Sequence, residues 1–206
     1  YFDQPRMISM PGAPRDIARA DFNQDGNADL AVALYAAGEI AILLGNGEGG
    51  FASDGRFISR GRLPAILRTA DLDSDGNSDL LVGHVHGDDS IVLFRGSGDG
   101  TFPLSQEITF GTNRDAVEFG VRDVVIADFD RNGKPDIAIT GYDAAELRVL
   151  LNHSASGFPL KFASETYSFR NGRPRALASA DLNGDGKLDL AVANWVTHRL
   201  EFFVQR

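Results

Sequence analysis

Short apolar runs bounded by Gly, Asn and Asp recur along the whole chain of 206 residues. Runs of this length between turn residues predict buried β-strands, not helices. Three kinds of run repeat in a fixed order. The first kind precedes an Asp-rich segment, at Ile17–Phe22, Leu67–Leu72, Val124–Phe129 and Leu177–Leu182. The second kind follows that segment, at Leu30–Leu34, Leu80–Val85, Ile137–Thr140 and Leu190–Ala193. The third kind lies at Ile40–Leu44, Ile91–Phe94, Leu147–Leu151 and Leu200–Val204.

A turn rich in small residues follows three of the third strands and leads to a Phe, at Phe51, Phe102 and Phe158. Glycine permits the positive φ angles that tight hairpins need, so the chain is expected to reverse here. A fourth strand is predicted after each of these turns, near Arg56–Ser59, Gln106–Phe110 and Glu165–Phe169.

The four-strand pattern repeats with a period of about fifty residues, because the Asp-rich segments begin at Asp21, Asp71, Asp128 and Asp181. A unit of that length with four strands is typical of a propeller blade. The sequence therefore predicts an all-β fold, a β-propeller of four four-stranded antiparallel blades in a single domain, 1–206. The blades are expected at about 16–59, 66–110, 123–169 and 176–206, the last joined by 1–10.

The two ends of the chain are out of phase with the blades by one strand. The last copy stops after its third strand, and Gly12, Pro14 and Arg15 fall where Gly172, Pro174 and Arg175 precede the next Asp-rich segment. We therefore expect the N-terminal strand to complete the last blade and close the ring, so that no sheet edge stays open. Four copies also fit part of a larger ring or half of a ring formed by two chains.

The four Asp-rich segments align without gaps and share one ten-residue pattern. Oxygen-bearing side chains stand at positions 1, 3, 5 and 9, and position 6 is always Gly, as at Gly26 and Gly133. Ca²⁺ takes six to eight oxygen ligands at about 2.3–2.6 Å, and closely spaced carboxylates repel unless a cation lies between them. An EF-hand would need a Glu at position 12, where the residues here are Val32, Val82, Ile139 and Val192.

The net charge of −9 comes from these segments, which hold thirteen of the 29 acidic residues. The sixteen acids that remain face 20 Lys and Arg. An acidic chain is a poor partner for nucleic acid. No apolar run is long enough to form a membrane-spanning helix, so membrane insertion is not expected. With no Cys in the chain, disulfides are excluded as well.

The spacing and composition of the four segments resemble the FG-GAP/VCBS repeat family, the calcium-binding blades of integrin α-subunit propellers and of many secreted proteins. The resemblance implies one Ca²⁺ per repeat, about four in all, bound between the first two strands of each blade. The Ca²⁺ ligands that it implies are Asp21, Asn23, Asp25, Asn27, Asp29, Asp71, Asp73, Asp75, Asn77, Asp79, Asp128, Asp130, Asn132, Lys134, Asp136, Asp181, Asn183, Asp185, Lys187 and Asp189, with position 7 contributing only its carbonyl.

The connections between strands 2 and 3 and those between blades are expected to share the rim opposite these loops. Aromatic residues or His begin the 2–3 connections, and Arg gathers in the connections between blades. Aromatic rings and guanidinium groups together suit a glycan or an acidic peptide. They also suit packing between blades and ion pairs with surface acids. The candidate ligand residues are Tyr35, His86, Tyr142, Trp195, Arg62, Arg122 and Arg173.

No catalytic motif stands out, so the chain is not expected to be an enzyme; His84 with His86, Asp88 with Asp89, and Glu39 are weak candidates. The function expected is a calcium-binding module for extracellular ligands, most of all carbohydrate, including anionic glycans. Alternatives are a protein adhesion or assembly module, with a homo-oligomer among its forms, and a domain associated with polysaccharide lyases or hydrolases. Extracellular millimolar calcium suits loops of modest affinity, so a secreted or cell-surface location is expected.

Overall fold

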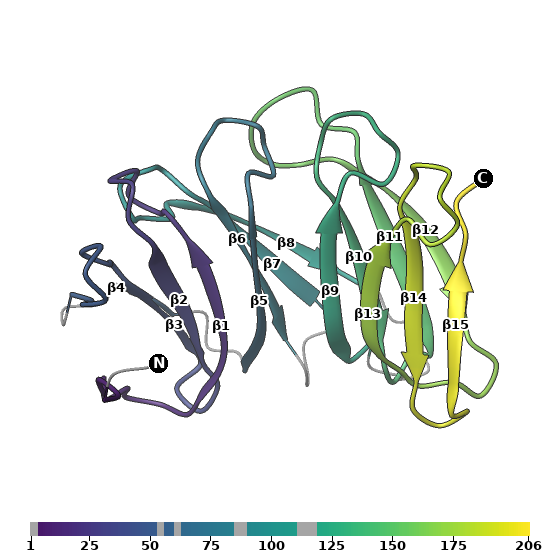
Figure 1. Cartoon of the computed structure of the whole chain (residues 1–206), viewed down its shortest axis with the longest axis horizontal. Coiled ribbons are helices and arrows are strands. Elements are labelled where there is room, and N and C mark those ends of the chain that lie inside the picture. Colours follow the sequence, from purple (N-terminus) through teal and green to yellow (C-terminus); the bar gives the residue numbers. More distant parts are fainter. Residues whose placement is uncertain (1–3, 53–55, 60–62, 85–89, 111–118) are drawn as a thin grey trace.

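The computed structural model of this chain describes residues 4–52, 56–59, 63–84, 90–110 and 119–206. Every regular element in those ranges is a β-strand, and all strand pairs are antiparallel. The strands form four separate sheets (Figure 1). The all-β, antiparallel fold class predicted from the apolar runs is confirmed.

Each sheet consists of strands that are consecutive in the chain. Sheet 1 contains β1 (Pro14–Ala20), β2 (Asp29–Leu34), β3 (Glu39–Leu43) and β4 (Arg56–Ser59). Sheet 2 contains β5 (Pro64–Ala70), β6 (Asp79–His84), β7 (Ser90–Arg95) and β8 (Leu104–Thr109). Sheet 3 contains β9 (Val121–Ala127), β10 (Asp136–Gly141), β11 (Glu146–Asn152) and β12 (Phe162–Ser168). Sheet 4 contains β13 (Pro174–Ala180), β14 (Asp189–Asn194) and β15 (Arg199–Phe203).

The sheets pack face to face, and three apolar clusters lie between them. Ile40 and Ile42 of sheet 1 meet Leu67 and Val82 of sheet 2. Equivalent clusters join sheet 2 to sheet 3 and sheet 3 to sheet 4. The second strands are buried on both faces, which explains why they read as continuous apolar runs and not as alternating ones. The first strands β1, β5, β9 and β13 lie next to one another along the inner side of this series.

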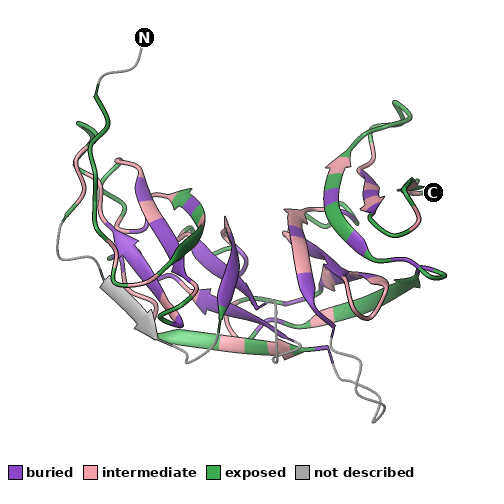
Figure 2. Cartoon of the chain, turned by 90° about the horizontal axis from the view of Figure 1, so that it is seen from below, coloured by how far each residue is buried: buried purple, intermediate pink, exposed green. Residues whose placement is uncertain are grey.

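The four sheets form an open arc, with the two ends of the series well apart (Figure 2). Sheet 4 has three strands, and residues 4–10 form no strand. Among the described residues, the predicted closure of the ring by the N-terminal strand is therefore not seen, and sheet 4 has no fourth strand there. The segment is held at sheet 1, where Met10 packs against Val32, Leu34, Ala41 and Leu43 and the Ala13 carbonyl accepts a hydrogen bond from Tyr35 N at 2.9 Å.

Candidate metal loops and binding rim

The four Asp-rich loops join the first and second strands of each sheet, and they lie along one edge of the arc, the upper edge in Figure 1. Each loop folds around its first Asp. In the second loop, Asp71 Oδ1 accepts a hydrogen bond from Asp75 N at 3.0 Å, and Asp71 Oδ2 accepts one from Gly76 N at 2.9 Å. The same pair of acceptor oxygens organises the loops that begin at Asp21, Asp128 and Asp181.

Two positions of every loop have a left-handed backbone. The glycines at position 6 have φ between 81° and 87°, a region that L side chains rarely adopt, so the invariant Gly is explained. Position 4 is also left-handed, at Gln24, Ser74, Arg131 and Gly184. This second left-handed position was not predictable from residue type, because three of these four residues are not Gly.

The ninth residue of each loop is a fully buried Asp that joins three strands. Asp79 Oδ2 accepts a hydrogen bond from Leu72 N at 2.8 Å, and its Oδ1 accepts one from Gly96 N at 2.8 Å, just beyond β7. Asp29, Asp136 and Asp189 make the same two kinds of contact. Position 9, predicted as a ligand, thus has a structural task that spacing alone did not reveal.

Within the described ranges, two loops bring three acidic side chains together: Asp71, Asp73 and Asp79, and Asp128, Asp130 and Asp136. In each group, one carboxylate oxygen per residue lies within 4.8 Å of the others. Asp73 is buried, and its Oδ1 has no hydrogen-bond partner in the described structure. A buried carboxylate oxygen without a donor is costly, and a hard divalent cation is the species that such a group of oxygens suits.

Burial dominates the electrostatics of Asp79 in the second loop, and the neighbouring carboxylates add to its effect. Burial raises the pKa of Asp79 to about 6, against the lowering effect of the Gly96 and Leu72 amides, and the charges of Asp73 and Asp75 raise it further. Burial likewise raises the pKa of Asp136 in the third loop.

A guanidinium group enters the second loop from β7. Arg95 Nε donates to Asp73 Oδ2 at 2.7 Å, and its NH2 donates to Asp75 Oδ2 at 2.5 Å. By strand register, the residues equivalent to Arg95 are Leu44, Leu151 and Val204, which carry no charge. The second loop is therefore the one in which an arginine of the neighbouring strand forms ion pairs with two carboxylates of the loop.

In the first and fourth loops, position 3 is Asn instead of Asp. Asn23 Nδ2 donates to Asp25 Oδ2 at 3.1 Å, and Asn183 Nδ2 donates to Asp185 Oδ2 at 3.1 Å. The backbone N–H of Asn27 lowers the pKa of Asp25, and the backbone N–H of Lys187 lowers the pKa of Asp185. Each of these two loops has three acids, but its Asp at position 5 is exposed and its carboxylates do not converge as those of the second and third loops do, which favours weaker cation binding.

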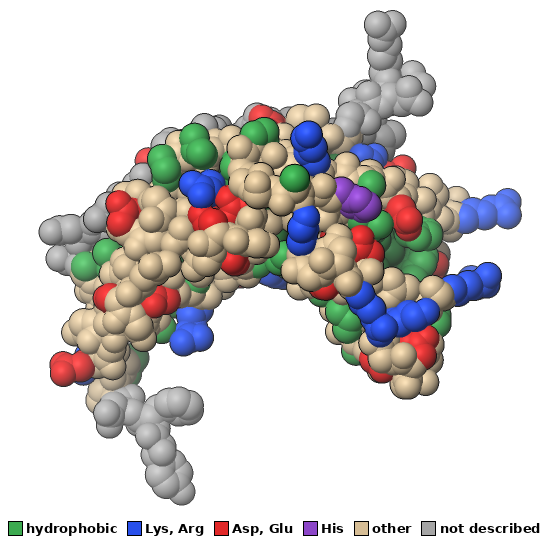
Figure 3. Space-filling model, turned by 90° about the horizontal axis from the view of Figure 1, so that it is seen from above, with side chains coloured by type: hydrophobic (Ala, Val, Ile, Leu, Met, Phe, Trp, Pro, Cys, Tyr) green, Lys and Arg blue, Asp and Glu red, His purple; other side chains and the backbone are tan. Residues whose placement is uncertain are grey.

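Position 7 is compatible with its predicted role as a carbonyl ligand. Lys134 directs its ammonium to the Ser154 carbonyl, away from its own loop. Neighbouring loops are also linked, from position 4 of one loop to position 6 or 7 of the next. Gln24 Nε2 donates to Asn77 Oδ1 at 2.6 Å, and Arg131 donates to the Gly186 carbonyl. Figure 3, which looks onto this edge, shows acidic side chains in separate groups along the arc.

The 2–3 turns occupy the opposite edge, where guanidinium groups stack on aromatic rings. Arg15 lies 4.6 Å from the centroid of the Tyr35 ring, and Arg175 lies 4.9 Å from that of Trp195. Both Arg122, at 4.8 Å, and Arg173, at 4.9 Å, approach the ring of Tyr142. Arg173 also forms an ion pair with Asp143, with 2.8 Å between its NH1 and Oδ1.

A β-bulge explains which arginines reach the rings. Register shifts occur at the start of each first strand and leave one residue out of the pairing, at Arg15, Ala65, Arg122 and Arg175. A bulge redirects a side chain, so the bulged Arg can lie over the aromatic residue at the end of the second strand. Arg15 and Arg175 were not among the predicted ligand residues.

The most open part of this rim is at sheet 4. Trp195 is 59% exposed and lines a recess of about 430 Å³ together with Arg175 and His198. Tyr35 and Tyr142 are half-buried. Arg62 and His86, also predicted as ligand residues, lie outside the described residues, as do Asp88 and Asp89.

His84, the remaining member of the predicted His pair, is buried at the end of β6. Glu39 lies at the start of β3.

A series of similar antiparallel sheets, three with four strands and one with three, each with an Asp-rich loop at the same edge, defines a β-propeller type of repeat protein. A family model described as FG-GAP-like repeat matches residues 21–82, 71–139 and 128–192. The chain belongs to the FG-GAP-like repeat family.

Two solved structures are similar to this chain in fold. One is a lectin from Agrocybe aegerita, whose structure concerns specific recognition of non-reducing terminal N-acetylglucosamine. It is 18% identical, with a TM-score of 0.58, over 87% of this chain and 47% of the lectin. The other is BBS1N in complex with ARL6DN, 11% identical, with a TM-score of 0.59, over 93% of this chain and 57% of that chain. The chain thus spans about half the length of these proteins. No curated protein sequence matches it.

Proposed function

We propose that this chain is a calcium-dependent, non-enzymatic propeller module that binds carbohydrate outside the cell. The calcium part rests on the second and third loops, where three carboxylates converge and one buried oxygen of Asp73 lacks a donor. Ca²⁺ would supply positive charge at these oxygens and hold the loop between the first and second strands. Asp71, Asp73, Asp75 and Asp79 would hold it in the second loop, with the carbonyl of Asn77.

The order of affinities follows from charge. The third loop has three acids and no guanidinium in the group, so it is expected to bind Ca²⁺ most tightly. The second loop has four acids, but Arg95 competes for Asp73 and Asp75. The first and fourth loops, with Asn23 and Asn183 at position 3, also have three acids each, but these are not gathered into a group of three carboxylates, so their affinity is expected to be weaker.

Replacing Arg95 tests whether the guanidinium and the ion compete. The substitution Arg95→Leu, which copies Leu44 and Leu151, is expected to raise the calcium affinity of the second loop roughly ten-fold, because it removes a positive charge that pairs with two of the expected ligands, Asp73 and Asp75. Isothermal titration, compared with the charge-matched control Arg199→Leu on β15, measures the change. Equal affinities in the two variants would show that Arg95 and the ion do not share the loop.

The carbohydrate part rests on the rim of stacked arginines and aromatic rings, and above all on the exposed indole of Trp195 beside Arg175. Sugar rings present apolar C–H faces to aromatic rings. Anionic sugars add carboxylate or sulfate groups, which a guanidinium group binds through two parallel hydrogen bonds. The likeness of fold to a lectin supports this class of ligand over others.

Glycan-array binding in millimolar calcium is the corresponding test. The substitution Trp195→Ala is expected to weaken binding roughly ten-fold or more, because a large contact area is lost, whereas Trp195→Phe should retain most of it. Leu104→Ala, an exposed apolar residue on β8, serves as the control. Retention of full binding by Trp195→Ala would place the ligand elsewhere, and capture of acidic peptides instead of glycans would favour the protein adhesion alternative.

A location outside the cell fits both parts, because millimolar calcium there would fill loops of modest affinity. Within the described ranges, no helix has the length and hydropathy needed to cross a membrane.

A further inference from the structure

The last sheet exposes a face that each of the other sheets buries. This surface consists of Leu182, Leu200 and Phe202, which are 48%, 64% and 58% exposed. We call it the trailing face of sheet 4. By loop position and strand register, the equivalent residues of sheets 1 to 3 are at most 7% exposed and pack against the following sheet. These equivalents are Phe22, Ile40 and Ile42, then Leu72, Ile91 and Leu93, then Phe129, Leu147 and Val149.

The first sheet exposes the complementary position at the other end of the arc. Ile17 on β1 is 59% exposed, whereas its equivalents Leu67, Val124 and Leu177 are at most 8% exposed and contact the preceding sheet. We call this surface of sheet 1 its leading face. The two ends of one molecule therefore carry the two halves of the contact that joins its sheets internally.

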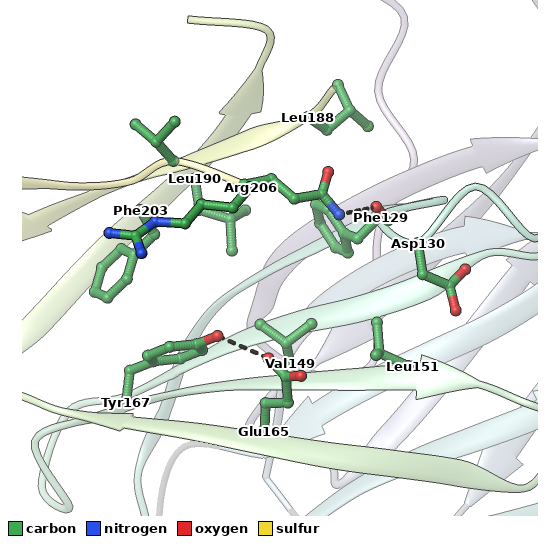
Figure 4. A pocket seen from close by; sticks show the side chains of 12 residues that line it. Phe129, Asp130, Val149, Leu151, Glu165, Tyr167, Leu188, Leu190, Phe203 and Arg206 are labelled. Atoms are coloured by element: carbon green, nitrogen blue, oxygen red, sulfur yellow. Dashed lines mark hydrogen bonds between the residues drawn. The ribbon is translucent and has the colours of Figure 1, made fainter. Parts of the chain in front are cut away.

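The outer edge of sheet 4 is open in the same region. Among the described strands, none pairs with β15 on its outer side. A cavity of about 440 Å³ lies beside it, between β15 and the outer strands of sheet 3, lined by Val149, Tyr167, Phe203 and other residues (Figure 4).

At the equivalent place between sheets 2 and 3, the backbone around Leu160 occupies the space beside β8. Gln106 of β8 accepts a hydrogen bond from Leu160 N at 2.6 Å and donates one to the Leu160 carbonyl at 2.8 Å. By register, Glu165 of β12 takes the position of Gln106. Its carboxylate lines the cavity and accepts a hydrogen bond from Tyr167 OH at 2.7 Å, so it is placed to accept a further N–H from incoming backbone.

The connectivity of the fold indicates which segment would occupy the open edge beside β15. The fourth strand of each sheet continues into the first strand of the next, so the residues before β1 belong beside the third strand of whichever sheet packs on sheet 1. Sheet 4 of the same molecule lies at the far end of the open arc (Figure 2). A second copy of the chain can place its own trailing face against the leading face of the first.

We propose that two copies of this chain join head to tail into one closed ring. The trailing face of each copy covers the leading face of the other, and the residues preceding β1 of each copy run beside β15 of the other. Two such contacts close a cyclic dimer and leave no sheet edge open.

The polar groups at the two faces are also compatible. Where sheet 2 meets sheet 3, the residue that sheet 2 places at the contact is the apolar Ile66. On sheet 3, Val124 N donates a hydrogen bond to the side chain of its neighbour Asp123 at 2.9 Å. Sheet 4 has Ala176 at the position of Ile66. On sheet 1, Ile17 N donates a hydrogen bond to the side chain of its neighbour Asp16 at 2.9 Å. No buried amide would be left without an acceptor at this position.

Light scattering after gel filtration in calcium tests the proposal. The expected mass is about twice the 22.2 kDa of one chain. The substitution Phe202→Glu should weaken the dimer roughly 100-fold, because burying an unpaired carboxylate costs several kcal/mol. Leu104→Glu, on an exposed strand away from both faces, should remain dimeric. A monomeric wild-type chain at ~100 µM, an open series of larger oligomers, or a dimer unaffected by Phe202→Glu would each overturn the ring.

A mixing experiment separates this ring from a dimer in which trailing faces meet each other. Phe202→Glu and Ile17→Glu should each be monomeric when alone. When mixed, they retain one intact contact of the two, so a heterodimer weaker than the wild type should form. Failure of the mixture to associate, with both variants folded by circular dichroism, would contradict the head-to-tail arrangement. Glycan binding is a separate readout, so either proposal can fail alone.

Discussion

Removing calcium is expected to lower the melting temperature of this protein by roughly 10–20 °C. An ion at 100 times its Kd stabilises the folded state by about 2.7 kcal/mol, and two well-formed loops would contribute about 5 kcal/mol. In a chain of this size, each kcal/mol shifts the melting temperature by about 2–4 °C. Thermal unfolding in millimolar calcium and in excess chelator measures the difference directly.

Magnesium is the matched control for this result. Mg²⁺ demands near-octahedral geometry and loses its water reluctantly, so it should restore much less of the lost stability than Ca²⁺. A melting temperature that is the same with calcium, with magnesium and with chelator would mean that the loops fold without an ion. The hydrogen bonds made by Asp71 and Asp79 within the second loop would then be sufficient to hold it.

The second large effect is expected at position 9 of the loops. The substitution Asp79→Ala removes the acceptor of two buried amides, Leu72 N and Gly96 N, each of which costs about 1–3 kcal/mol when left unpaired. The free energy of unfolding should therefore fall by roughly 3 kcal/mol even in chelator.

Asp75→Asn is the control for that experiment. Asp75 pairs with Arg95 and accepts a hydrogen bond from Asn77 N, and Asn keeps an acceptor oxygen there. The change should therefore cost at most about 1 kcal/mol in chelator, the usual value of a partly exposed ion pair, and should cost more in calcium. Urea unfolding under both conditions separates the two roles. Equal losses for Asp75→Asn and Asp79→Ala in chelator would contradict the structural role given to Asp79.

Much of the architecture could be predicted from the sequence because the signals are local. Apolar runs that recur every fifty or so residues, together with Asp and Gly at fixed loop positions, identify the strands and the turns that join them. The buried second strands, such as β10, show why: each is a continuous apolar run bounded by a buried Asp and a turn. Such features need no knowledge of the neighbouring sheets.

Contacts that join distant parts of the chain were not predictable in the same way. Arg95 reaches Asp73 only because β7 pairs with β6 in one particular register. The stacking of Arg15 on Tyr35 depends on a β-bulge, which cannot be predicted from the residue types at that position. These features follow from three-dimensional packing, and the bulge in particular redirected the choice of arginines at the rim.

The expected ring closure is not seen in the described residues, for a related reason. The similarity between residues 12–15 and 172–175 correctly describes how a chain enters a first strand, as the matching hydrogen bonds Tyr35 N to Ala13 O and Trp195 N to Arg173 O show. It does not say which sheet receives the strand before it. The angle between successive sheets decides that, and here four sheets leave the arc open (Figure 2).

Direct measurement of bound calcium is the sharpest test of the metal loops. Equilibrium dialysis against millimolar calcium, followed by elemental analysis, should find at least two ions per chain, and Asp71→Ala together with Asp128→Ala should remove them. Absence of bound calcium in the folded wild-type protein at that concentration would contradict the account.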